Sequence, residues 1–312
     1  MQSYEWGEFR RHHGWKPVRL LDSDRGAACQ VLLRDLRGVG SLAYAPHGPV
    51  CAAEDLDGVT SEVADRARAL GAFTLEVEPR VPEGTAIEAE GFLRSASSVQ
   101  PRCTLVVDLL NSSEEQLKAL PKDTRYGVRR AGREGIEAGP SQDRDRDLED
   151  FLSLLEETAG RQGFAVRPRE YYRRFLRELP AHLVVAHKDG VLLAGAVLLT
   201  FGEEAYYLYG ASAREGDNLY ASYLVQYEAL SVVREHGARR YDMWGIPCDP
   251  HEGHPLWGVY GFKKKFGGRE ERYAGAYEKR LRPVRAALAR TAIKGYYAAQ
   301  KLRGRTSGPI SD

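Results

Sequence analysis

The sequence predicts an α/β protein built from two similar domains in tandem. Its 312 residues suit two domains of roughly 150 residues each. Hydrophobic residues make up 43 % of the chain, which is enough for a sizeable core. The expected elements of the first half run strand, turn, strand, helix and strand, and the second half repeats that order.

The first half alternates expected strands and helices. The stretch QVLLRDLRGVGSLAYAPHGPV predicts two strands around a glycine-containing turn. A helix is expected over residues 61–70, with Thr60 or Ser61 as its N-cap and Gly71 as its end. FTLEVE and CTLVVDLL predict further strands. SSEEQLKAL predicts a short capped helix, and RYGVRRAGREG predicts a basic helix that Gly135 ends.

The second half follows the same plan. Helices are expected over residues 148–160 and at EYYRRFLREL, followed by three strands with turns at KDG and GEE. A long helix over residues 220–236 places its apolar side chains on one face, and RRYDMWG predicts the next strand. The stretch GPSQDRDRD, residues 139–147, is polar and lacks apolar periodicity, so we expect the junction between the domains there.

The C-terminal stretch differs from the rest in charge. Residues 279–305 carry nine basic side chains and no acidic one, and Pro283 near the start favours a helix. Such a helix lies on an anionic membrane or against RNA, or it packs as a solvated helix on the domain surface. The sequence leaves these alternatives open.

Composition and cysteine use restrict the class of protein. The chain has 45 Lys and Arg against 44 Asp and Glu, so any polyanion site must be a local patch. The N-terminus has no apolar stretch of signal-peptide length, and no segment is apolar enough to predict a transmembrane helix. The four cysteines are far apart, and we expect reduced thiols in a cytoplasmic protein: Cys29, Cys51, Cys103 and Cys248.

Several common catalytic motifs are missing from the sequence. It has no G-x-x-x-x-G-K-[ST] phosphate loop, no G-x-S-x-G elbow and no H-E-x-x-H metal motif. The stretch CDPHEGHP offers metal-ligating side chains, but its spacing fits no metal motif, so we expect a polar loop and no metal site.

The strand–helix order is typical of an acetyltransferase-like (GNAT) fold. Enzymes of that fold that use acetyl-CoA carry an R/Q-x-x-G-x-G/A turn before a helix, whose backbone N–H groups hold the pyrophosphate. The segment before the long helix here is ASAREGDNLYASYL, which lacks that turn. We therefore expect an acyl donor other than acetyl-CoA.

An ordered set of segments resembles one known family. These are QSYEWGEFRRHHGW (pattern QS-x-x-W…GW), YAPHGPV (Y-x-P-R-G-P, with His47 in place of arginine), QPRCTLVVDL, TRYGVRRAGREG (R-x-x-[IV]-R-x-A-x-x-G), YYLYGAS, YDMWGI and GFKKKFGG (F-K-x-x-F-G-G). Together they span nearly the whole chain. The chain resembles the Fem-type aminoacyltransferases, non-ribosomal peptidyltransferases that build peptidoglycan cross-bridges.

The resemblance implies a fold and a reaction. The fold is two tandem GNAT domains without a coiled-coil arm, and the C-terminal helix returns to the first domain. Domain 1 is therefore expected to be residues 1–145 with 276–312, and domain 2 residues 146–275. The reaction moves an amino acid from aminoacyl-tRNA to the side-chain amine of the third stem-peptide residue of UDP-MurNAc-pentapeptide or lipid II. We expect a monomer without a cofactor other than the tRNA co-substrate, with peripheral contact at the inner membrane face.

The resemblance also implies catalytic residues. Lys263 occupies the F-K position and is expected to stabilise developing negative charge, while Phe262 shapes the site and offers its backbone. Lys264 and Lys265 are expected to face solvent or RNA phosphate. Asp108 ends a strand and is expected either to orient or deprotonate the amine or to act only as a turn or capping residue.

Four further residues are implied in acceptor binding. Arg167 and Tyr171 match an Arg/Tyr pair, and helical spacing of four would place them on one face unless Pro168 sets Arg167 before the helix. Arg169 is a competing match. Tyr209 matches another acceptor-binding tyrosine, and Arg10 stands where the family usually has lysine. A core or strand role is the alternative for each tyrosine.

Two other functions remain compatible with the sequence. One is an acyl-CoA-dependent N-acyltransferase, which the missing pyrophosphate turn disfavours. The other is a non-catalytic protein that binds RNA or a membrane surface through the basic C-terminal segment.

Overall fold

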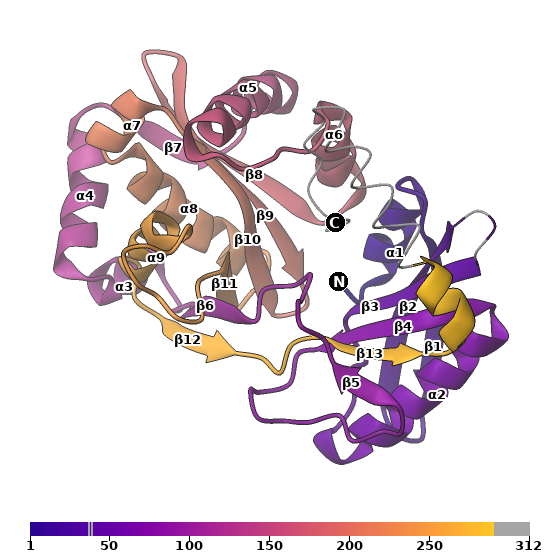
Figure 1. Cartoon of the computed structure of the whole chain (residues 1–312). Coiled ribbons are helices and arrows are strands. Elements are labelled where there is room, and N and C mark those ends of the chain that lie inside the picture. Colours follow the sequence, from indigo (N-terminus) through magenta and orange to yellow (C-terminus); the bar gives the residue numbers. More distant parts are fainter. Residues whose placement is uncertain (37, 39, 290–312) are drawn as a thin grey trace. The chain divides into compact units, whose positions relative to one another are not determined.

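The computed structural model of the chain describes residues 1–36, 38 and 40–289 and divides into two compact units (Figure 1). The first unit comprises residues 1–102 and 272–312, and the second comprises residues 103–271. Each unit has a sheet and helices of its own.

The first unit is a six-stranded mixed sheet in the order β1-β2-β3-β4-β13-β5. Its elements are α1 (Tyr4–Arg11), β1 (Lys16–Asp22), β2 (Ala27–Leu36), β3 (Gly40–His47), α2 (Leu56–Ala69), β4 (Ala72–Pro79), β5 (Phe92–Arg94) and β13 (Tyr277–Arg280). Ser3 is the N-cap of α1, and its side chain accepts a hydrogen bond from the Trp6 backbone N–H. Strand β13 pairs antiparallel with both β4 and β5, so the chain returns to the first unit after completing the second.

Alternation along the strands of the first unit separates its two faces. Val31, Ala43 and Ala45 share a core cluster with α2 residues such as Val63 and Ala64. The neighbouring residues Leu32 and Tyr44 pack instead against Trp15, because successive strand side chains point to opposite faces. Thus α2 covers one face and Trp15 contributes to the cover of the other.

The second unit is a seven-stranded mixed sheet in the order β12-β6-β11-β10-β9-β8-β7. Its strands are β6 (Cys103–Asp108), β7 (Glu137–Pro140), β8 (Ala181–Lys188), β9 (Val191–Phe201), β10 (Glu204–Ser212), β11 (Arg240–Gly245) and β12 (Arg269–Arg272). Its helices are α3 (Ser113–Ala119), α4 (Lys122–Arg133), α5 (Arg144–Gln162), α6 (Arg169–Glu178), α7 (Arg214–Asn218), α8 (Ala221–Glu235) and α9 (Trp257–Lys264).

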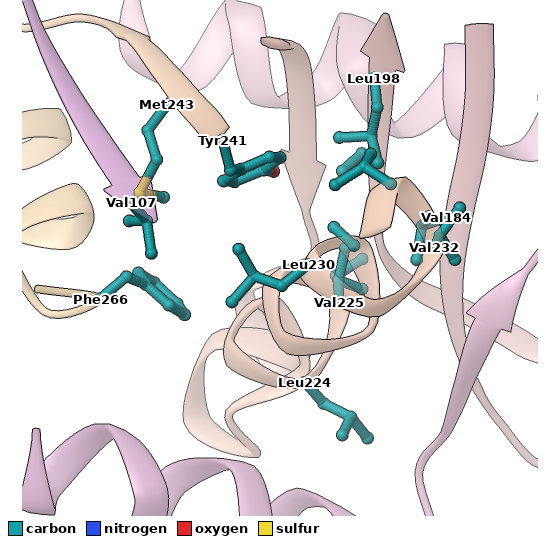
Figure 2. Packing of buried hydrophobic residues seen from close by; sticks show 14 of the residues in the cluster. Val107, Val184, Leu198, Leu224, Val225, Leu230, Val232, Tyr241, Met243 and Phe266 are labelled. Carbon is teal, nitrogen blue, oxygen red and sulfur yellow. The ribbon is translucent and has the colours of Figure 1, made fainter. Parts of the chain in front are cut away.

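Helices cover both faces of the second sheet. Ala194 and Ala196 of β9 belong to the core cluster that includes α8, whereas a Cβ at Gly195 between them would meet Phe151 of α5. Helices α8 and α5 therefore lie on opposite faces. Figure 2 shows the α8 side, where apolar side chains of α8 gather with strand residues: Leu224, Val225, Leu230 and Val232 with Leu198, Tyr241 and Met243.

The predicted repeat of elements is confirmed. In the first unit β1, β2 and β3 are antiparallel, α2 follows, and β4 pairs parallel with β3. In the second unit β8, β9 and β10 are antiparallel, α8 follows, and β11 pairs parallel with β10. The chain is thus two GNAT-like units in tandem.

The expected domain junction near residue 145 differs from the division in the structure. Gly139 and Pro140 belong to β7, which pairs with β8 at the edge of the second sheet, and Asp143 caps α5. Polar residues and a proline are tolerated there because the outer side of an edge strand has no ladder to complete. The first half of the chain therefore gives β6, α3, α4 and β7 to the second unit.

The expected C-terminal helix is partly corrected. Lys279 and Arg280 belong to β13, and helix begins at Pro283 and covers residues 283–289 of the described chain. Ala286 and Ala289 pack against Phe73 in the first unit, as a return of this segment to that unit requires. The remainder of the expected basic helix, with its contact to RNA or a membrane, lies outside the described residues.

The expectation of four reduced thiols is wrong for one pair. Cys103 and Cys248 form a disulfide across 145 residues of sequence, since β6 and the end of β11 are neighbours, whereas Cys29 and Cys51 are free. Separately, within the described part of the chain, none of the helices has the length and apolar character needed to span a bilayer.

The close approach of α5 to β9 gives a stability prediction. A Cβ at Gly195 would lie 2.7 Å from Phe151 Cδ2 and 3.4 Å from the Val184 carbonyl oxygen. We expect Gly195→Ala to lower the free energy of unfolding by about 1–3 kcal/mol through overpacking, measured by urea denaturation. Gly139→Ala on β7 is the control, because its Cβ would meet nothing within 4 Å. Equal effects of the two substitutions would contradict this packing.

Candidate active site

The second unit opens where its two parallel strands separate. Strands β10 and β11 pair only from Glu204↔Arg240 to Tyr206↔Asp242 in the described structure. Beyond Asp242 the register with β6 shifts, and Trp244 has a left-handed backbone with φ of 66°. In open α/β sheets ligands bind at the carboxyl ends of such strands. The matching pair in the first unit, β3 and β4, stays paired from Ser41 to His47.

Lys263 lies at this separation of the strands. It belongs to the last turn of α9 and is 6 % exposed. Its Nζ donates a hydrogen bond to the Gly245 carbonyl oxygen at 2.8 Å and lies 5.9 Å from the centre of the Tyr207 ring. Burial lowers the pKa of Lys263 to about 8, and the nearby Asp242 carboxylate opposes part of that effect. The side chain is therefore mostly an ammonium at neutral pH, in surroundings that strengthen its field.

Asp242 is the buried carboxylate that faces this ammonium. It is 4 % exposed and accepts hydrogen bonds from the Thr104 hydroxyl and, at 2.8 Å, from the Trp244 backbone N–H. Donors on the neighbouring strand and on the turn after β11 thus fix its position. We did not predict this residue from the sequence, although a carboxylate inside the apolar strand RRYDMWG is a usable signal.

The stretch FKKKF, residues 262–266, covers the end of helix α9 and the first residues after it. Phe262 lies on α9 and packs against Tyr223 at 5.9 Å and Phe266 at 5.3 Å between ring centres. The chain then turns at Gly267 and Gly268, which have φ of 75° and 84°. A Cβ at Gly268 would lie 2.4 Å from the Val106 carbonyl oxygen, so this close approach requires glycine.

The other two lysines of the run lie in exposed positions. Lys264 is exposed and pairs with Glu270 at 2.7 Å, while Lys265 is exposed near the Tyr223 ring. Burial therefore distinguishes the three lysines, because Lys263 is buried and the other two are exposed.

Three predicted acceptor-binding residues come together at the start of α6. The Arg167 guanidinium lies 5.8 Å from the Tyr171 ring centre, and the Tyr209 hydroxyl on β10 donates to the Tyr171 hydroxyl at 3.4 Å. Pro168 is the N-cap of α6, so Arg167 precedes the helix. Arg169, the competing match, is held by Glu156 and Glu149 of α5 and faces that helix.

Arg10 lies in the first unit and is 3 % exposed. Its guanidinium carbon is 5.7 Å from the Trp6 ring centre and 5.4 Å from the Trp15 ring centre. These aromatic faces stabilise a buried cation and hold it in one orientation.

Asp108 does not join Lys263. It ends β6 as predicted, but β6 runs antiparallel to β11, so Asp108 lies opposite Arg240 while Thr104 lies opposite Gly245. Its carboxylate is exposed and pairs with Arg269 at 2.6 Å. The four residues from Thr104 to Asp108 separate the two positions by roughly 13 Å along the strand. Asp108 and the Lys263 site therefore lie toward opposite ends of β6, and the part of Asp108 in orienting or deprotonating the amine stays a prediction.

The CDPHEGHP segment has no metal-binding arrangement in the described structure. Cys248 is joined to Cys103, and His251 and His254 contact each other edge to face at 5.8 Å. Within the described residues, no three or more His, Cys, Asp or Glu side chains form a group that could hold a metal ion.

Comparisons with known proteins find similarity to one family model and to relatives over most of the chain. The FemAB family model matches residues 83–187 and 181–294. The UDP-N-acetylmuramoylpentapeptide-lysine N(6)-alanyltransferase of Weissella viridescens is 28 % identical over 307 residues, which cover 90 % of this chain and 89 % of the relative. The lipid II:glycine glycyltransferase of Staphylococcus haemolyticus is 23 % identical and covers 86 % of this chain and 84 % of its own length.

A solved structure shares the fold. The crystal structure of FemX has a TM-score of 0.82 to this chain at 22 % identity, and the match covers 92 % of this chain and 93 % of that chain. The tandem arrangement of two GNAT-like units therefore occurs in a structure determined by experiment.

The buried position of Lys263 gives a prediction about stability. Its pKa falls from 10.5 to about 8, which corresponds to roughly 3 kcal/mol of unfavourable burial. Because the unfolded chain binds the proton more tightly, this cost is complete below pH 8 and disappears as the pH rises toward 10.5. We expect Lys263→Met to raise the free energy of unfolding at pH 7 by about 1–2 kcal/mol, since the lost bond to Gly245 offsets part of the gain.

The measurement is urea denaturation at pH 7 and pH 10. Lys264→Met is the matched control, because its exposed pair with Glu270 contributes little. A variant at Lys263 that is less stable than wild type at pH 7 would show that the ammonium contributes net stability to the fold.

Proposed function

This chain belongs to the FemAB family, and from that premise we propose that it transfers an amino acid from aminoacyl-tRNA to a peptidoglycan precursor. The acceptor group in this proposal is the side-chain amine of the third stem-peptide residue, on UDP-MurNAc-pentapeptide or lipid II. The observation that carries the proposal is the buried ammonium of Lys263 where β10 and β11 separate. The proposal includes a cytoplasmic monomer that needs no cofactor beyond its tRNA co-substrate.

The names of the relatives support the choice of acceptor. One relative is named for alanyl transfer to the N(6) amine of lysine on a UDP-N-acetylmuramoyl pentapeptide, and the other is named as a lipid II:glycine glycyltransferase. Both names describe the transfer of an aminoacyl group and include a cell-wall precursor, and the first also names the accepting amine. We extend that reaction class to this chain.

Aminoacyl transfer creates negative charge at two oxygens. Attack of the amine makes the ester carbonyl tetrahedral and anionic, and the ribose oxygen then leaves with a developing charge. The Lys263 ammonium, held by the Gly245 carbonyl oxygen and faced by Asp242, supplies a positive charge that is fixed before the reaction. Because burial excludes water around it, this charge stabilises the transition state more strongly than a surface lysine would.

The cluster around α6 supplies groups suited to the acceptor. Arg167 offers a guanidinium for a diphosphate or carboxylate, and the hydroxyls of Tyr171 and Tyr209 lie beside it. In the proposal these three residues bind the precursor, and the assignment of Arg10 to acceptor binding stays a prediction. The cation–π contact of Arg167 with Tyr171 favours one position of the guanidinium before the substrate arrives.

The segment before α8 disfavours an acyl-CoA donor. Acyl-CoA enzymes of this fold hold the pyrophosphate with backbone N–H groups in a glycine-rich turn at this position. Here the segment forms helix α7, and the N–H groups of Asp217 and Leu219 donate to Ala213 and Glu215. These N–H groups are engaged within the helix and do not point to a ligand.

A donor competition assay tests the proposed function. The protein is incubated with a charged tRNA pool and either UDP-MurNAc-pentapeptide or lipid II, and the product mass is measured. We expect a mass increase of one aminoacyl residue, and no transfer when acetyl-CoA replaces the charged tRNA. Transfer from acetyl-CoA would overturn the proposal in favour of an N-acyltransferase.

Substitution of Lys263 tests its role through the dependence of rate on pH. Lys263→Met is expected to lower kcat about 100- to 1,000-fold at pH 7, as the loss of one charge-stabilising group does. The ratio of wild-type to variant rate should fall as the pH rises through about 8, because only wild type loses the ammonium. The effect of pH on the acceptor amine is the same in both assays, so it cancels in this ratio of rates.

Two controls accompany that variant. Lys264→Met retains the buried ammonium, and Asp108→Asn changes a carboxylate at the far end of β6, so both should keep rates within about threefold of wild type. A pH-independent ratio would assign Lys263 a structural role, and a large loss in Asp108→Asn would restore that residue to the mechanism.

A further inference from the structure

Helix α4 carries a stripe of cations along its exposed side. We define the α4 stripe as Lys122, Tyr126, Arg129 and Arg133, which recur at spacings of four, three and four and therefore share one face. All four side chains are exposed, and the stripe is about 16 Å long at 1.5 Å per residue. A surface hollow follows this face and has these lining residues: Lys122, Arg125, Tyr126, Arg129, Gly132 and Arg133.

The charges of the α4 stripe have no acidic partner among the described residues. No salt bridge or side-chain hydrogen bond of the described chain involves Lys122, Arg129 or Arg133. The neighbouring cations are engaged: Arg130 pairs with Glu134, and Arg125 donates to the carbonyl oxygens of Lys118 and Leu120. Three cations in a row without counter-charges repel one another, so the surface is suited to an anionic partner.

The opposite face of α4 is committed to the core. Val128 and Ala131 belong to the cluster that contains α8, and a Cβ at Gly127 would lie 2.6 Å from the Tyr220 ring. An amphipathic helix that binds a membrane inserts its apolar face into the lipid. Since the apolar face of α4 is already buried, the stripe offers only cations and one exposed tyrosine.

That combination fits a nucleic-acid backbone better than a lipid surface. Arginine forms bidentate hydrogen bonds with phosphate, and an exposed tyrosine between cations offers a stacking face to a base or ribose. Lys122 and Arg129 are two helical turns apart, and Arg129 and Arg133 are one turn apart. Cations at these intervals suit contacts with separate phosphates along one strand.

The stripe begins next to the candidate active site. The Thr124 hydroxyl, on the first turn of α4, donates to the carbonyl oxygen of Lys265. Lys265 is exposed and follows Lys263 by two residues. A strand of phosphates that lies along the α4 stripe therefore meets the exposed Lys265 at the end of the helix nearest the buried ammonium.

We propose that the α4 stripe is the docking surface for the phosphate backbone of the tRNA acceptor arm. This inference rests on the proposed function, because it assumes that the donor is an aminoacyl-tRNA. In this arrangement Arg129 and Arg133 hold backbone phosphates away from the reacting ester, Lys122 and Lys265 hold those nearer to it, and Lys263 acts on the ester itself. The stripe supplies affinity for the donor and takes no part in the bond changes.

The test compares the double variant R129Q/R133Q with wild type in two assays. In the first, binding of deacylated tRNA is measured by fluorescence anisotropy over a series of salt concentrations. We expect the Kd to rise at least tenfold. The plot of log association constant against log salt concentration should become shallower by about 2, one for each lost phosphate contact. In the second, steady-state transfer should show a raised KM for aminoacyl-tRNA with kcat and the KM for the cell-wall precursor unchanged.

The control is R66Q/R68Q, which removes two exposed arginines from α2 of the first unit. It makes the same change in net charge and should leave the Kd and the salt slope at wild-type values. Equal effects of the two double variants, or wild-type binding by R129Q/R133Q, would overturn the docking surface. Failure of wild type to bind tRNA would overturn it as well.

The outcomes separate the docking surface from the proposed function. Loss of tRNA binding in R129Q/R133Q, in a protein that transfers no aminoacyl group, would support the surface and reject the reaction. Loss of binding to vesicles of anionic phospholipid, with tRNA binding intact, would assign the α4 stripe to a membrane and overturn the inference.

Discussion

The burial of the Lys263 ammonium is the constraint on which the site depends. An ammonium that is 6 % exposed needs nearby groups that favour its charged form. Gly245, which follows the left-handed Trp244 at the end of β11, accepts its hydrogen bond. The Asp242 carboxylate lies near enough to favour the ammonium, and the Thr104 hydroxyl and the Trp244 N–H hold it in place. The same departure from strand geometry that opens the sheet therefore holds the lysine in it.

The two units show what this departure adds to a repeated fold. Both have three antiparallel strands, a helix, and a strand parallel to the third. In the first unit β3 and β4 remain paired up to His47 and Pro79, so their backbone groups are used within the sheet. In the second unit pairing ends after three residues, which leaves backbone groups and side chains at the ends of β10 and β11 for a substrate. One fold, used twice, thus provides one reactive centre of this kind.

The sequence predicted the features that depend on local patterns. The repeat of elements, the basic helix α4 and the grouping of Arg167, Tyr171 and Tyr209 follow from periodicity and motif. It failed where a strand's partner and direction decide the result. The sequence of the strand that ends in Asp108 does not show whether the strand pairs parallel or antiparallel with its neighbour. Its antiparallel pairing with β11 places Asp108 away from Lys263. Similarly, β7 is too short and polar to be recognised as an edge strand.

The run of three lysines illustrates how burial divides chemically identical side chains. Residues two positions apart on a helix point about 200° away from each other, so Lys263 faces the sheet while Lys265 faces outward. Burial lowers the pKa of the first and makes its charge effective at short range, whereas solvent screens the charge of the second. A screened cation suits the reversible holding of a phosphate, and a desolvated one suits the stabilisation of a transient oxyanion. The turn at Gly267 and Gly268 keeps these two environments adjacent, because it holds the end of α9 against Val106 of β6.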